Sequence, residues 1–199
     1  MSRTEIMRAY LAERFVGQRF VLLAIVLSGA AFLVSTKPAE PLIALLRTLT
    51  SAFLLILALR VWDDLADRTR DAVEHPNRIT VRITSSNAFV ILGESAAFGW
   101  IALMLTGRDS PSRLLLFIAL CIALTIWYRT RRILGSSRLS AYAVLSKYPV
   151  IVVLIAPGQL RTPIIAVPVL VSLYLLLCIY ETLDDPSLQP LIFGRGSQP

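Results

Sequence analysis

The chain has 199 residues, 56% of them hydrophobic, and its mean hydropathy is +0.69. This balance excludes an ordinary soluble domain and indicates a membrane protein. The formal net charge is +7, but the basic residues flank apolar runs, so the charge fits membrane topology and excludes a nucleic-acid partner. His75 is the only histidine, which argues against a His-ligated zinc site, and the two cysteines lie inside apolar runs, which argues against a disulfide framework.

Residues 1–19 form a mixed-charge N-terminal segment. Its apolar residues recur at helical spacing: Ile6, Tyr10, Leu11 and Phe15. We therefore expect an interfacial helix that lies along the membrane surface. The next apolar run, 20–34, is short enough to resemble a signal peptide, but the long charged lead-in and the later apolar runs favour a retained first membrane helix.

Six apolar runs follow one another along the chain. They are Phe20 to Val34, Leu42 to Val61, Ala88 to Leu105, Leu114 to Tyr128, Ala141 to Ile155 and Ile164 to Ile179. Each is near the short end of the ~17–25 residues that cross a bilayer, and within lipid such runs must be helical to satisfy their backbone polar groups. The sequence thus predicts an all-α integral membrane protein with about six transmembrane helices. We expect one transmembrane domain over 1–199, with a short C-terminal tail at 186–199.

Basic residues are distributed unequally between the two ends of these runs. One membrane side collects fourteen: Arg3, Arg8, Arg14, Arg19, Arg60, Arg68, Arg70, Arg78, Arg82, Arg129, Arg131, Arg132, Arg138 and Arg195. The other side collects five: Lys37, Arg47, Arg108, Arg113 and Arg161. The positive-inside rule therefore predicts that both termini and the acidic motifs are cytoplasmic.

The most polar stretch is Trp62–Arg78, called the acid-rich segment below. It carries Asp63, Asp67 and Asp71 at a spacing of four, which on a helix places them one turn apart on one face. Three such carboxylates repel one another unless a cation lies between them, and oxygen ligands of this kind suit Mg²⁺. The alternative is a solvated helix with ion pairs at helical spacing, namely Asp64/Arg68, Asp67/Arg70 and Glu74/Arg78.

A second acidic group and a basic group fall on the same predicted membrane side. Glu181 and Asp185, again four apart, follow the sixth run, whereas Tyr128, Arg131 and Arg132 follow the fourth. Carboxylates that hold a metal, and arginines that take the remaining phosphate charge, are what a Mg²⁺–diphosphate requires.

These residues resemble the UbiA-type intramembrane prenyltransferases. The stretch D-D-L-A-D-R-T-R-D, Asp63 to Asp71, is similar to the family's first motif, N/D-D-x-x-D-x-x-x-D followed by an arginine. Glu181 and Asp185 are similar to its second motif, D-x-x-x-D, with Glu in place of the leading Asp. The family's enzymes have nine membrane helices, so the resemblance implies a UbiA-like bundle that lacks the last three helices.

The resemblance implies transfer of an isoprenoid group from a prenyl diphosphate to an acceptor. It implies Mg²⁺ as the cofactor, held by Asp63, Asp67, Asp71, Glu181 and Asp185. The implied catalytic residues are Asp67, Arg131, Arg132 and Lys147, and the implied substrate-binding residues are Arg68, Arg78, Tyr128 and Glu94. Alternatives are a UbiA-type terpene cyclase, a non-catalytic relative that binds prenyl lipid or supports another membrane enzyme, and an unrelated transporter or channel subunit.

Two further expectations concern the membrane interior. Glu94 and Lys147 lie within spans at similar depth, so we expect them to pair, unless Lys147 snorkels and Glu94 bonds a nearby hydroxyl. The small residues Gly93, Ala97 and Gly99 share one helix, so we expect a homo-oligomer or a membrane partner to pack against it.

Overall fold

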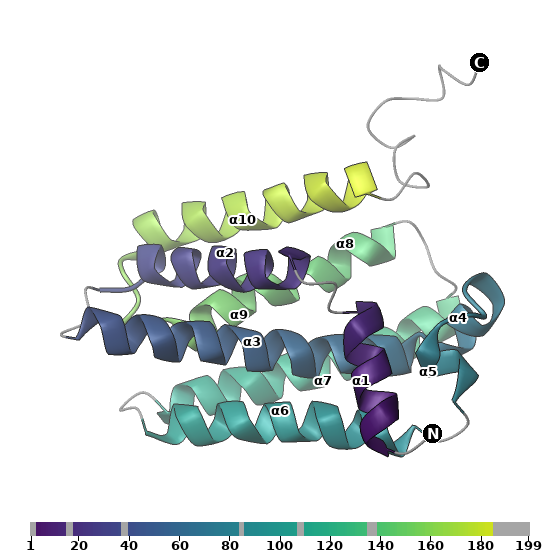
Figure 1. Ribbon diagram of the computed structural model, residues 1–199. Helices are drawn as coiled ribbons and strands as arrows, with labels where there is room; N and C mark the ends of the chain where they lie inside the picture. Colours follow the sequence, from purple (N-terminus) through teal and green to yellow (C-terminus); the bar gives the residue numbers. More distant parts are fainter. Residues whose placement is uncertain are drawn as a thin grey trace. The chain divides into compact units, whose positions relative to one another are not determined.

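The computed structural model describes residues 3–14, 18–36, 40–83, 86–106, 110–134 and 139–184, and regular structure within these ranges is helical apart from one isolated β-bridge. The helices are α1 (Arg3–Arg14), α2 (Gln18–Val34), α3 (Pro41–Ala66), α4 (Arg68–Glu74), α5 (Ile79–Arg82), α6 (Asn87–Leu105), α7 (Ser110–Leu134), α8 (Leu139–Leu145), α9 (Lys147–Ile155) and α10 (Pro163–Asp184) (Figure 1). The predicted all-α class is confirmed for the described part of the chain. The predicted tail at 186–199 lies outside it.

Four helices of the described part are long and apolar enough to cross a membrane: Pro41–Ala66, Asn87–Leu105, Pro111–Arg131 and Pro163–Asp184. The first predicted run forms a shorter apolar helix, Arg19–Val34, and the fifth falls in the apolar stretch Tyr142–Ile155, which a turn at Ser146 divides. These lengths and compositions indicate an integral membrane protein. The count of six spans stays a prediction, because two of the six runs are shorter than a bilayer normally requires.

Backbone contacts divide the chain into two compact units. Unit 1 comprises Met1–Gly29 and Ala39–Leu114, and unit 2 comprises Ala30–Pro38 and Leu115–Pro199. Helix α2 therefore contributes its first part to unit 1 and its last residues to unit 2. The two units are described in turn.

Unit 1 is built on the long contact between α3 and α6. Gly93 lies against Val61 of α3, where an added Cβ would meet Val61 Cγ1 at 3.2 Å, and Gly99 lies against Leu54. Because glycine lacks a side chain, the two backbones approach closely at these positions. Part of the surface of Gly93, Ala97 and Gly99 is therefore used within the chain, against α3 and the core beside it; the three residues are half-buried, and the predicted oligomer or membrane partner stays a prediction.

Arg47 is tolerated in the apolar helix α3 because it bonds to the end of α6. Arg47 Nη2 donates to the carbonyl oxygen of Leu103 at 2.5 Å, and Thr106 Oγ1 donates to the same oxygen at 2.7 Å. The last carbonyls of a helix have no partner within the helix and carry partial negative charge. Arg47 therefore caps the C-terminal end of α6.

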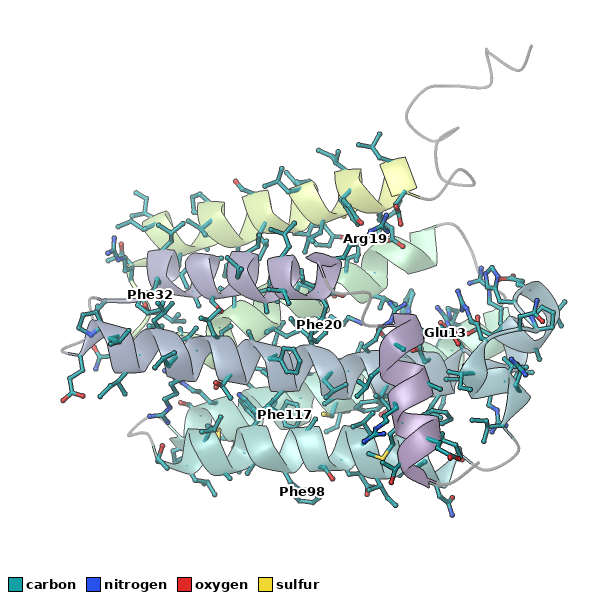
Figure 2. The ribbon with its side chains drawn as sticks, viewed as in Figure 1. Glu13, Arg19, Phe20, Phe32, Phe98 and Phe117 are labelled. Atoms are coloured by element: carbon teal, nitrogen blue, oxygen red, sulfur yellow. The ribbon has the colours of Figure 1, made fainter. Side chains whose placement is uncertain are left out.

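Helix α1 runs across α3 and α6 (Figure 1). The helix forms as the spacing predicts, but its apolar face packs on protein, because Tyr10 is completely buried and Ile6 and Leu11 lie against the same core. That core contains residues of α1, α3, α5 and α6: Tyr10, Leu57, Ala58, Val61, Ile79, Phe89 and Ala96. The start of α2 packs on α3 through an edge-on contact of Phe20 with Phe53, whose ring centroids are 4.7 Å apart (Figure 2).

Unit 2 contains most of α7 together with α8, α9 and α10. The fifth predicted run is not one helix, because α8 and α9 are separated at Ser146. Pro149 explains the break: proline has no N–H to donate to the carbonyl of Leu145 and its ring crowds that oxygen, but it is tolerated in the first turn of a new helix. At the break, the backbone N–H of Ser146 bonds to Ala143 instead of Tyr142.

Two tyrosines join this break to α10. Tyr174 Oη donates to the carbonyl oxygen of Tyr142 at 3.1 Å, and the hydroxyls of Tyr142 and Thr182 are 2.7 Å apart. At the other end of α10, the residues that precede it pair with the end of α2 through the bridge between Ser35 and Leu160. The N-terminal and C-terminal ends of α10 are therefore both fixed by hydrogen bonds within unit 2.

Candidate functional site

The acid-rich segment of unit 1 begins in the last turn of α3 and continues through α4. Backbone hydrogen bonds link Asp67 to Asp63 at 2.9 Å, Asp71 to Asp67 at 2.8 Å and His75 to Asp71 at 2.7 Å. This series of four-residue bonds continues helical geometry across Asp67, where α3 ends and α4 begins. The three aspartates of the predicted site therefore lie on successive turns, as their spacing predicts.

Asp64 has a different environment from its neighbours. It is 4% exposed, accepts a hydrogen bond from Tyr10 Oη at 2.8 Å, and lies 3.7 Å from Arg60 Nε. Buried carboxylates need hydrogen bonds and counter-charge, and Asp64 receives both. The pairing of Tyr10 with Asp64 could not be predicted from the sequence, because the two residues are 54 positions apart. The only signal was the adjacent pair Asp63 and Asp64, which cannot share one helical face.

Asp71 is the most buried of the acids, at 3% exposure, and Arg78 Nη1 donates to its Oδ1. Arg68 reaches out of the segment and donates to the carbonyl oxygen of Ile83. Arg70 and Glu74 form an exposed ion pair at 2.7 Å on the outer face of α4. Ion pairs therefore form in the segment, but with partners other than those of the alternative interpretation: Asp64 lies near Arg60, Glu74 pairs with Arg70, and Asp71 pairs with Arg78.

The sequence predicts that the carboxylates of this segment bind Mg²⁺. Among the residues that the structure describes, no group of three or more Asp, Glu, His or Cys side chains could hold a metal ion. Carboxylates on successive turns are oxygen donors of the kind that Mg²⁺ prefers, whereas the Arg78 guanidinium already pairs with Asp71.

The second acidic group lies at the C-terminal end of α10, in unit 2. Glu181 is half-buried, Asp184 is exposed, and Asp185 lies outside the described residues. Between them Thr182 is buried, and it bonds both to Tyr142 and to the carbonyl oxygen of Cys178. Thr182 therefore links the end of α10 to α8.

The predicted basic group belongs to the end of α7. Tyr128 is buried, and the Arg131 guanidinium lies over its ring, 5.3 Å from the centroid. This cation–π contact orients Arg131. Arg132 follows in the same helix, and its side chain is not among those that the structure describes.

The two ionisable residues within predicted spans differ in exposure. Lys147, in unit 2, is 3% exposed and begins α9, with its ammonium group 5.4 Å from the Tyr148 ring centroid. Glu94, in α6 of unit 1, is exposed, although we expected it to face the interior. The proposed Glu94–Lys147 pair itself stays a prediction.

Comparisons of the chain with protein-family models, with curated proteins and with solved structures find no match.

Proposed function

We propose that this protein is a membrane-embedded prenyltransferase of the UbiA type, which transfers an isoprenoid group from a prenyl diphosphate with Mg²⁺ as cofactor. One observation carries the proposal: at the end of a helix long enough to span a membrane, three aspartates lie on successive turns, with arginines around them. Acids at the helix end suit a headgroup of a membrane-embedded lipid better than an ion path, which requires acids at mid-membrane depth.

The residues would divide the work as follows. Asp63, Asp67 and Asp71 would hold Mg²⁺, with Glu181 and Asp185 as the second acidic group. Bound there, the metal would supply charge neutralisation of the diphosphate oxygens. Arg68, Arg78, Arg131, Arg132 and Lys147 are the cations available to bind phosphate oxygens and to stabilise the departing pyrophosphate.

The bond that breaks joins the allylic carbon of the isoprenoid to a diphosphate oxygen, and its electron pair leaves with pyrophosphate. The acceptor forms the new bond to that carbon and loses a proton. The apolar spans would keep water from the allylic carbon. Tyr128 offers an aromatic face to the allylic carbon.

The excess of basic residues on one side of the apolar runs supports a cytoplasmic position for both termini and both acidic groups. The prenyl diphosphate would then enter from the cytoplasmic side with its tail in the bilayer. A homo-oligomer or a membrane partner remains part of the proposal, and Gly93 and Gly99 already pack in part against α3 of the same chain.

Purified protein in lipid nanodiscs, incubated with radiolabelled prenyl diphosphates of different chain lengths, tests the proposal. We expect pyrophosphate release that requires Mg²⁺ and is lost in Asp67→Asn. Release together with a hydrocarbon product and no acceptor would identify a terpene cyclase. Mg²⁺-dependent binding without release would identify a non-catalytic relative, and absence of binding would overturn the proposal.

A further inference from the structure

The N-terminal helix contacts the acid-rich segment at its beginning. Tyr10 of α1 is completely buried, and its hydroxyl donates to Asp64 Oδ2 at 2.8 Å. The Tyr10 ring also packs on Phe89 of α6, with the ring centroids 5.2 Å apart. A hydrogen bond to an ionised carboxylate is among the stronger ones, and burial of both partners prevents water from replacing it.

The same helix contacts the residue that directly follows the segment. Glu13 Oε2 accepts a hydrogen bond from the backbone N–H of Ile79 at 3.0 Å, at the start of α5. Figure 2 labels Glu13 in the part of α1 that lies near α4 and α5 in this view. Ile79 is itself buried in the core that contains Tyr10. Helix α1 therefore holds both ends of the acid-rich segment, one through Asp64 and the other through Ile79.

Fixing both ends constrains what lies between them. Asp67 and Asp71 follow Asp64 within two helical turns, and the chain then returns through Arg78 to Ile79. Because α4 has only seven residues, too few for a helix that is stable by itself, its position depends on contacts with the rest of unit 1, and the two attachments to α1 are among them.

We propose that Tyr10 and Glu13 are positioning residues of the acid-rich segment, so that its aspartates are arranged for a divalent cation only while α1 is attached. The cation part of this inference rests on the proposed function. The attachment part rests on the contacts of Tyr10 and Glu13 alone. Asp64, held by Tyr10, then serves the fold of the segment while the other aspartates serve the cation.

Tyr10→Phe tests this role because it removes the hydroxyl and keeps the ring that packs on Phe89. The control is Arg47→Gln, which removes a side-chain bond from the opposite end of α3, about 25 Å away at ~1.5 Å rise per residue. Both proteins in nanodiscs are compared with the wild type by hydrogen–deuterium exchange of residues 63–83. Binding of Mn²⁺ alone, as a spectroscopic probe for Mg²⁺, is measured in parallel.

We expect Tyr10→Phe to raise amide exchange in 63–83 at least about tenfold and to weaken Mn²⁺ binding by a similar factor. Glu13→Ala, which removes the acceptor of the Ile79 N–H, should raise exchange most strongly around Ile79. Arg47→Gln should lower the melting temperature without changing either quantity. This difference separates positioning from a general loss of stability.

Each contrary outcome has a distinct meaning. Unchanged exchange in Tyr10→Phe overturns the inference. If the wild type binds Mn²⁺, then faster exchange in Tyr10→Phe without any change in its Mn²⁺ affinity also overturns it. If the wild type binds no Mn²⁺, the proposed cation function fails, and the exchange data alone decide whether α1 positions the segment.

Discussion

The two acidic groups of this protein have the same spacing of four residues but are held in different ways. In unit 1, Asp63 and Asp71 are buried and Asp67 between them is half-buried, while Arg78 contacts Asp71 and Tyr10 of α1 contacts the neighbouring Asp64. In unit 2, the acids at the end of α10 are half-buried or exposed, and the buried residue among them is Thr182.

Spacing alone therefore does not make a carboxylate part of a site. A four-residue spacing places side chains on one face, but burial requires other elements to pack on that face. Helix α1 supplies this packing for the first group. For the second group, Tyr142 of α8 contacts Thr182 near the end of α10.

Asp67→Asn tests the first group most directly, because Asp67 is the central acid of the series. If the proposed function holds, the change should reduce Mg²⁺-dependent pyrophosphate release at least about 100-fold, since an amide oxygen is a weaker ligand than a carboxylate. Glu74→Gln is the matched control, because Glu74 lies in the same segment in an exposed ion pair. Equal loss in both variants would show a general charge effect and would contradict the assignment.

Arg78→Gln should destabilise unit 1 because it leaves the buried Asp71 without its guanidinium. The Arg78 side chain is 28% exposed and that of Asp71 is 5% exposed, so we expect a loss of about 2 kcal/mol, below the usual cost of breaking a fully buried pair. Arg70→Gln should change stability by less than about 0.5 kcal/mol, because its pair is solvated.

The double variant Arg78→Gln/Asp71→Asn completes this test. It should recover part of the stability, because no buried charge is then left without compensation. Thermal unfolding in detergent measures the stability of the wild type, the two single arginine variants and the double variant. Equal losses in Arg78→Gln and Arg70→Gln would mean that burial of Asp71 has no energetic consequence.

The features that the sequence predicts here are those that depend on neighbouring residues. Apolar runs become helices because the backbone must satisfy itself in an apolar environment, and the aspartates of the acid-rich segment take successive turns because helical geometry is local. The break at Ser146 is a local feature of the same kind, because Pro149 lies inside the fifth apolar run and disfavours one continuous helix there.

The contacts between distant residues could not be read in this way. Nothing near Asp64 in the sequence indicates Tyr10, and nothing near Gly93 indicates whether its face meets α3 or another chain. Both depend on which helices pack together, which periodicity leaves open. An ionisable residue within a membrane span is expected to face the bundle interior, but Glu94 is exposed.

Tyr142→Phe tests how the second group is held. The variant removes the hydroxyl that lies 2.7 Å from Thr182 Oγ1 but keeps the ring. We expect a loss of about 1 kcal/mol, the usual net value of one hydrogen bond, because Thr182 keeps its bond to the carbonyl oxygen of Cys178. Hydrogen exchange should rise at the end of α10 and stay unchanged in residues 63–83. A rise in both places would show that the two groups do not depend on separate contacts.

The smallest effect concerns two glycines of α6 that differ in how near they lie to the acid-rich segment. An added Cβ at Gly99 would meet Leu54 at 3.5 Å, an ordinary contact, so Gly99→Ala should stabilise the protein by about 0.5 kcal/mol through helix propensity. At Gly93 the same atom would meet Val61 at 3.2 Å, and Val61 is itself buried directly before the segment. Gly93→Ala should therefore lose the gain in propensity to strain, leaving stability unchanged or slightly reduced. Thermal unfolding of the two variants side by side measures the difference, and an equal gain in both would show that Val61 can move and that the start of the acid-rich segment is less tightly packed than its burial indicates.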